Sequence, residues 1–259
     1  MLIDSHTHLD HCREDAAVLV ADARAAGVGL IIQCGTDLAR SRRSVELAGQ
    51  FPEVVAAVGY HPHEAGRIDD AGWSEVEGWT THPRVVAVGE TGFDYHHDHW
   101  PHGVQGEVFV QHLDLARCAG LPVVVHTRDA AEDTLETLAD HAQGLTVIMH
   151  CFSLPGLLDE VVSRGYYIGF AGNVTYKNAL DLQEAARSVP SHLLLLETDA
   201  PWLAPMPGRG RPNRPGLVAK TYDFVAELRD LDVAELAAQV EANVRHAFPR
   251  VVTALEAAR

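Results

Sequence analysis

The chain has 259 residues, of which 47% are hydrophobic, and 20 Lys and Arg against 36 Asp and Glu give a formal net charge of -16. A single α/β barrel domain spanning residues 1–259 fits this length, as two small domains would. The acidic balance argues against an evenly basic protein that coats duplex nucleic acid, because cations that neutralise phosphates supply most of that affinity. A substrate with phosphates would need local positive charge from metal ions or a few arginines.

Cysteine usage and hydropathy predict a reduced, cytoplasmic protein. Its four cysteines form no C-x-x-C pair, and no N-terminal apolar stretch resembles a signal peptide. Apolar runs such as Leu193–Leu196 are far shorter than the roughly 20 apolar residues of a membrane span. We expect no membrane partner, and either a monomer or a small homo-oligomer.

Short aliphatic runs recur along the chain, and each precedes an amphipathic stretch such as Arg13–Ala26 or Val104–Ala119. Eight such runs are predicted strands: Leu2–His6, Val28–Cys34, Val54–Tyr60, Val85–Glu90, Pro122–His126, Thr146–His150, Tyr166–Ala171 and Leu193–Thr198. Strand then helix, repeated eight times, predicts an α/β fold of the TIM-type (β/α)8 barrel class. Extra C-terminal helices are expected after Gly216. A doubly wound open sheet is the alternative that periodicity leaves open.

The first predicted strand ends in Asp4-Ser5-His6-Thr7-His8. Because side chains alternate along a strand, Asp4, His6 and His8 point to the same side. Two histidines so placed can share one metal ion. Such a pair is a weak signal by itself, since His61-Pro62-His63 has the same spacing.

Other predicted strands also end in potential metal ligands, which would converge at the C-terminal mouth of a barrel. The candidate ligands are His6, His8, Glu90, His126, His150 and Asp199. Four imidazoles and two carboxylates suit Zn, Mn, Fe or Ni better than Ca or Mg, although Mg is not excluded. Six donors exceed the three protein ligands typical of one open zinc site, so we expect two divalent metal ions with Glu90 as bridge.

These segments resemble the signature blocks of the TatD family, a branch of the metal-dependent amidohydrolase superfamily, from Ile3–Asp10 to Asn243–Phe248. The resemblance implies a dinuclear hydrolase of phosphodiesters, commonly a DNase with 3′ to 5′ exonuclease character. We expect it to act on single-stranded ends of nucleic acid. The resemblance assigns one metal to His6, His8, Glu90 and Asp199, and the other metal to Glu90, His126 and His150. Glu90 and Asp199 are the predicted catalytic residues, with Asp199 accepting the proton of the metal-activated water.

Several polar residues could contact the substrate or support the ligands: Asp4, His61, His63, Arg128 and Arg214. The loop after the fourth strand carries His96, His97, His99 and His102, where the family pattern leads us to expect tyrosines or arginines. The alternative to the nuclease is a metal-dependent deacylase, for example one that removes a D-amino acid from tRNA. A third hypothesis is a non-catalytic binding protein.

Overall fold

The computed structural model describes residues 1–256, in which eight strands form one sheet in chain order. Each pair of strands for which the register is defined is parallel. The strands are β1 (Leu2–Thr7), β2 (Val28–Cys34), β3 (Val54–Val58), β4 (Val85–Asp94), β5 (Val123–Arg128), β6 (Val147–Met149), β7 (Tyr167–Phe170) and β8 (Leu194–Leu196).

Helices follow the strands in the predicted alternation. They are α1 (Ala16–Ala25), α2 (Leu38–Gln50), α3 (Asp70–Trp79), α4 (His102–Ala119), α5 (Ala131–His141), α6 (Leu158–Ser163), α7 (Leu180–Ser188), α8 (Val218–Leu228), α9 (Val233–Ala247) and α10 (Arg250–Glu256). Asp15, Asp37 and Asp69 cap the N-termini of the first three helices, because each carboxylate accepts a hydrogen bond from a backbone N–H of the first turn. Within residues 1–256, no helix has the length and apolar character required to cross a membrane.

The chain divides into two compact units, and the expectation of a single domain stays a prediction. Unit one consists of Met1–Gln33 and His150–His246, and unit two consists of Cys34–Met149 and the residues from Ala247 onward. Unit one therefore contains β1, β7, β8 and nearly all of β2. Unit two contains β3 to β6.

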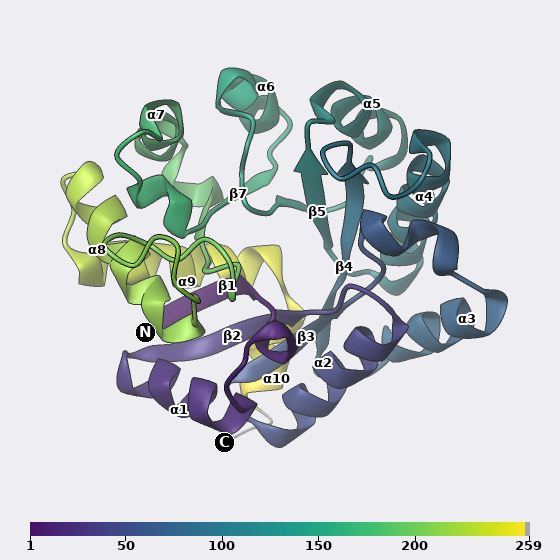
Figure 1. The fold of residues 1–259 in the computed structure, drawn as a ribbon, viewed down its shortest axis with the longest axis horizontal. Helices are drawn as coiled ribbons and strands as arrows, with labels where there is room; N and C mark the ends of the chain where they lie inside the picture. The colour runs from purple at the N-terminus through teal and green to yellow at the C-terminus, as the bar shows by residue number, and fades with distance from the viewer. Residues whose placement is uncertain (257–259) are drawn as a thin grey trace. The chain divides into compact units, whose positions relative to one another are not determined.

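Unit one joins the first and last strands of the sheet. The Asp199 amide after β8 donates to the His6 carbonyl at 3.0 Å, and the His8 amide donates to the Ala200 carbonyl at 2.9 Å. With the strand order from β1 to β8, this neighbourhood closes the sheet and confirms the (β/α)8 barrel rather than an open sheet. Figure 1 shows β1 and β2 side by side in this unit.

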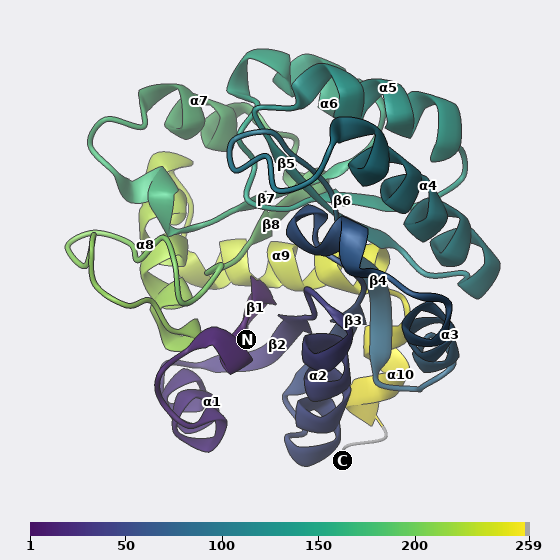
Figure 2. The same ribbon diagram turned by 45° about the vertical axis from the view of Figure 1, so that its right-hand side comes forward.

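Unit two positions the longest strand, β4. All ten residues of β4 are buried, as expected for a parallel strand covered on both faces. The strand continues to Asp94 and so passes the predicted end at Glu90. Helices α4 and α5 lie side by side and pack against β4 and β5 (Figures 1 and 2). Glu90 and Asp94 are consequently held in one rigid strand.

Candidate metal centre

The first group of candidate ligands belongs to unit one and consists of His6, His8 and Asp199. The Nε2 atoms of His6 and His8 lie 3.0 Å apart, and Asp199 Oδ1 lies 3.6 Å from His8 Nε2 and 4.0 Å from His6 Nε2. Both imidazoles are buried. A tetrahedral zinc ion with bonds near 2.1 Å holds its ligand atoms about 3.4 Å from one another. These three side chains therefore fit a divalent cation after shifts of less than about 1 Å.

Asp199 combines a buried position with an environment that favours its charge. Burial raises the pKa of this carboxyl. The hydrogen bond from His8 and the neighbouring His150 ring are among the effects that lower it, and together these outweigh burial, so the net pKa lies below its ordinary value. The hydrogen bond from its amide to the His6 carbonyl fixes the turn that carries it. Asp199 is therefore an ionised carboxylate that can bind a cation or accept a proton.

His150 follows β6 and stacks on His6, with ring centroids 3.7 Å apart. Its Nδ1 lies 3.2 Å from Glu197 Oε1, an oxygen that also accepts a hydrogen bond from the Cys151 amide at 2.6 Å. We assign the ring proton to Nδ1 because the carboxylate can only accept, and this leaves the Nε2 lone pair for a metal. A Cβ at Gly169 would overlap the Glu197 carboxylate, so this glycine provides the space for it.

Asp4 supports the loop that carries Asp199. It is fully buried and accepts hydrogen bonds from the Thr198 amide at 2.8 Å and the Thr198 hydroxyl at 2.6 Å. Burial raises the pKa of Asp4 well above its ordinary value, despite these bonds. Because Thr198 directly precedes Asp199, Asp4 holds the backbone next to Asp199, the predicted proton acceptor.

The second group of candidate ligands belongs to unit two and centres on Glu90 and His126. Glu90 Oε1 lies 2.8 Å from His126 Nδ1, and His126 Nε2 lies 3.2 Å from Asp94 Oδ2. Each ring nitrogen thus faces a carboxylate, whereas a neutral imidazole has one N–H. If Nε2 donates its proton to Asp94, Nδ1 offers a lone pair beside Glu90, as a metal ligand requires. Gly92 permits the close strand pairing, since a Cβ there would overlap the His126 carbonyl.

His61 is placed beside Glu90, but its tautomer argues against a ligand role. Its Nδ1 accepts a hydrogen bond from the His63 amide at 3.1 Å, so in the neutral ring Nε2 carries the proton. Burial, followed by the neighbouring His126, lowers the pKa of His61 well below its ordinary value and keeps the ring neutral. Nε2 lies 3.6 Å from Glu90 Oε1. His61 is therefore an N–H donor that suits a supporting or substrate contact, and His63 contacts Asp94 at 2.9 Å.

The two arginines suggested as phosphate contacts differ in their surroundings. Arg128 ends β5, two residues after His126, and is exposed. Arg214 Nη2 donates to Glu14 Oε1 at 3.1 Å, and its Nη1 lies 3.9 Å from Asp22. The charge of Arg214 is already paired within unit one, so Arg128 is the better candidate for a phosphate contact.

Three residues that the sequence interpretation did not select lie against the candidate ligands. Glu197 contacts His150, Asp94 contacts His126, and Trp202 lies next to His8 with ring centroids 5.4 Å apart. The sequence signal for the two carboxylates is their spacing, because Glu197 is two residues before Asp199 and Asp94 is four residues after Glu90. The signal for Trp202 is its place in the loop after β8. It remains 47% exposed and offers a surface on which a nucleobase can stack.

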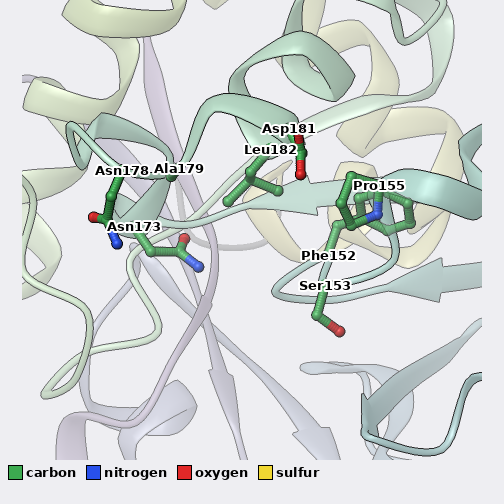
Figure 3. A pocket seen from close by; sticks show the side chains of 8 residues that line it. All are labelled: Phe152, Ser153, Pro155, Asn173, Asn178, Ala179, Asp181 and Leu182. Carbon is green, nitrogen blue, oxygen red and sulfur yellow. The ribbon is translucent and has the colours of Figure 1, made fainter.

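Unit one also contains a pocket of about 250 Å³ between the loops that follow β6 and β7. Figure 3 shows the Asn173 amide on one side of it and Phe152 and Pro155 on the other. Asn173 Oδ1 is buried and has no hydrogen-bond partner among the described residues. Phe152 lies two residues after His150, so the pocket begins close to a candidate ligand along the chain.

Comparison with known proteins identifies the family. Residues 3–249 match the family described as TatD related DNase. The chain belongs to the TatD family. It is 37% identical over 260 residues to a TatD protein of Mycobacterium tuberculosis named an uncharacterized metal-dependent hydrolase, covering 95% of this chain and 97% of that protein.

Two further TatD relatives extend the comparison. A protein of Escherichia fergusonii, named 3'-5' ssDNA/RNA exonuclease TatD, is 33% identical over 244 residues, with 91% of this chain and 93% of that protein covered. The crystal structure of YJJV, a TatD homolog from Escherichia coli K12, superposes with a TM-score of 0.87 at 29% identity and covers 96% of this chain and 98% of that chain. The resemblance and the barrel fold predicted from the sequence are confirmed.

Proposed function

We propose that this TatD-family chain is a divalent-metal-dependent hydrolase that removes nucleotides from the 3′ ends of single-stranded DNA. Two cations would be held by the predicted ligands His6, His8, Glu90, His126, His150 and Asp199. The observation that carries the proposal is the ligand chemistry of both groups, in which paired imidazole nitrogens and carboxylates lie 2.8–4.0 Å apart. Buried nitrogens and carboxylates at this spacing fit metal ions.

Three features support a nucleic-acid substrate. The Escherichia fergusonii relative is named as an exonuclease of single-stranded DNA and RNA. Trp202 is exposed beside His8 and could stack on an unpaired base, which duplex ends do not offer as readily. The third feature is Arg209 in the loop after β8, a cation that could contact a phosphate. Its guanidinium lies 4.4 Å over the Tyr176 ring and donates to Asn178, which lines the pocket.

The protein side chains have separate tasks in this account. Divalent cations at these ligands would lower the pKa of an attacking water and polarise the phosphoryl oxygen. Asp199, ionised near neutral pH, accepts the proton of that water and can return it to the leaving oxygen. Glu197 and Asp94 orient the imidazoles of His150 and His126. His61 presents its N–H toward the same region of unit two as Glu90.

A substrate panel tests the proposal against the deacylase alternative. Purified protein with Mg²⁺ or Mn²⁺ is given single-stranded oligonucleotides, duplexes with blunt ends, and a D-aminoacyl-tRNA, at several salt concentrations. We expect turnover of the single strands with an apparent affinity that falls steeply as salt rises, because phosphate contacts release counterions. Deacylation of the D-aminoacyl ester without release of nucleotides would contradict the nuclease and support the deacylase.

A further inference from the structure

The histidine-rich loop after β4 packs onto the 3-10 helix η2 (Pro62–Arg67) of the same unit. The Trp100 indole N–H donates to the His63 carbonyl at 2.9 Å, and the His99 ring stacks on the His63 ring with centroids 4.5 Å apart. The His97 amide donates to Asp94 Oδ1 at 2.9 Å. These contacts bring the unusual histidines of the loop to Asp94 and His63.

One oxygen of Asp94 is contacted by more imidazole nitrogens than it can accept protons from. His63 Nε2 lies 2.9 Å from Asp94 Oδ2, His97 Nδ1 lies 3.2 Å from it, and His126 Nε2 also lies 3.2 Å from it. A carboxylate oxygen has two lone pairs, so three N–H donors exceed its capacity. If His126 donates its Nε2 proton to one lone pair of Asp94 Oδ2, a single lone pair remains for His63 and His97, whereas a cation bound there could accept the lone pairs of both nitrogens.

Asp94 is well suited to hold a cation. Its side chain is 1% exposed, and its backbone N–H and carbonyl are both bonded to the Gln105 side chain, at 2.8 and 3.3 Å. His63 and His97 are 28% and 41% exposed, so the nitrogens beside this fixed carboxylate can be reached from solvent.

We propose that His63, Asp94 and His97 form an additional site for a divalent transition-metal ion, separate from the six predicted ligands. The two nitrogen–oxygen distances of 2.9 and 3.2 Å are within roughly 0.5 Å of the separation of about 3.4 Å between the ligands of a tetrahedral zinc ion. His61 is not part of the site, because its Nδ1 accepts the His63 amide and its Nε2 carries the proton.

The ligand set defines the class of ion. Two imidazoles and one carboxylate select Zn²⁺, Co²⁺, Ni²⁺ or Cu²⁺ over Mg²⁺ and Ca²⁺, which prefer oxygen. Three protein ligands leave a fourth position for water or an anionic oxygen of a ligand. The site therefore resembles an open zinc site in its chemistry rather than a closed structural one.

The test compares zinc binding by the wild type with that by His97→Ala and His63→Ala. The matched control is His96→Ala, because His96 lies in the same loop, is exposed, and pairs with Asp129 at 3.1 Å instead of Asp94. Each protein is dialysed against Zn²⁺ and analysed for metal content, and thermal unfolding checks that the variants fold. Crystals soaked in Zn²⁺ are measured at the zinc absorption edge to locate the ions.

We expect His97→Ala and His63→Ala each to bind about one zinc equivalent less than the wild type, while His96→Ala binds the wild-type amount. The anomalous signal should include a peak bonded to His63 Nε2, His97 Nδ1 and Asp94. Equal zinc content in the wild type and His97→Ala, or zinc crystals without that peak, would overturn the proposal. Because the readout is metal content, the result is independent of nuclease activity.

Discussion

Glu197 Oε1 lies 3.2 Å from His150 Nδ1 inside unit one, and the carboxylate is completely buried. The same oxygen accepts the Cys151 amide, so its position is fixed from two sides. A carboxylate that holds the Nδ1 proton orients the ring and makes Nε2 a better metal ligand. Metal affinity should therefore depend on Glu197, a residue that is not itself a predicted ligand.

Replacing Glu197 by Gln should weaken divalent-metal binding by about 10- to 100-fold, because the amide cannot hold the Nδ1 proton as the carboxylate does. Glu184→Gln is the matched control, since Glu184 lies in α7 of the same unit and is 69% exposed. Isothermal titration with Zn²⁺ measures both affinities. Identical affinities in the two variants would remove Glu197 from the account.

Glu90→Ala and Asp199→Asn should each abolish turnover of a single-stranded oligonucleotide, but their metal contents should differ. Glu90 is the predicted shared ligand, so its loss should also reduce the bound metal. Asp199→Asn keeps an oxygen donor and removes the carboxylate that accepts the proton. Steady-state assays with elemental analysis of the same preparations separate the two effects. Full activity in either variant would contradict its assigned role.

Trp202→Ala should raise the KM for single-stranded oligonucleotides about fivefold or more, because base stacking on an aromatic ring is worth about 1–3 kcal/mol. Trp202→Phe keeps an aromatic face and should recover most of this affinity. The KM for bis(p-nitrophenyl) phosphate, which has no nucleobase, should be similar in the Trp202→Ala and Trp202→Phe variants. An unchanged oligonucleotide KM in Trp202→Ala would exclude stacking at this position.

His112 should make folding stability depend on pH. The ring is fully buried, its Nδ1 donates to the Val108 carbonyl at 2.7 Å, and its Nε2 accepts the Tyr60 amide at 2.9 Å. Burial lowers the pKa of His112 from 6.5 to about 4, although the bond to Val108 raises it slightly. Because the unfolded chain binds the proton more tightly, stability is fully present above pH 6.5 and is lost as pH falls towards 4.

The loss that His112 contributes should reach about 3 kcal/mol at pH 4 and below. His112→Asn removes the titrating group, so its free energy of unfolding, although lower at pH 7, should fall less between pH 7 and 4.5. Urea unfolding at a series of pH values measures this difference in slope. Parallel pH profiles for the two proteins would show that His112 does not titrate on unfolding.

The barrel could be predicted from the sequence because its strands are buried on both faces. Val54–Val58 is an uninterrupted run of apolar residues, all buried, and such runs recur between amphipathic helices. The strand end at Glu90 was wrong because Thr91-Gly92-Phe93-Asp94 lacks an aliphatic run, yet it pairs with β5 through backbone hydrogen bonds. Backbone pairing of this kind leaves little trace in a hydrophobic pattern.

The candidate ligands were visible because each comes directly or shortly after an apolar run in the sequence, but their supporting contacts were not. The contact of Glu197 with His150 joins residues 47 positions apart, and that of His97 with Asp94 depends on how a loop folds back. The tautomer of His61 follows from a single hydrogen bond to the His63 amide. These features require three-dimensional positions, and spacing in the sequence does not contain them.

The most direct test of the account is the release of nucleotides from a 3′-labelled single-stranded oligonucleotide, with and without a chelator. We predict stepwise release of the label with Mg²⁺ or Mn²⁺, complete loss of release with chelator, and recovery when the metal is restored. An intact oligonucleotide in the presence of protein-bound metal, or release that persists in chelator, would contradict a metal-dependent 3′ to 5′ exonuclease.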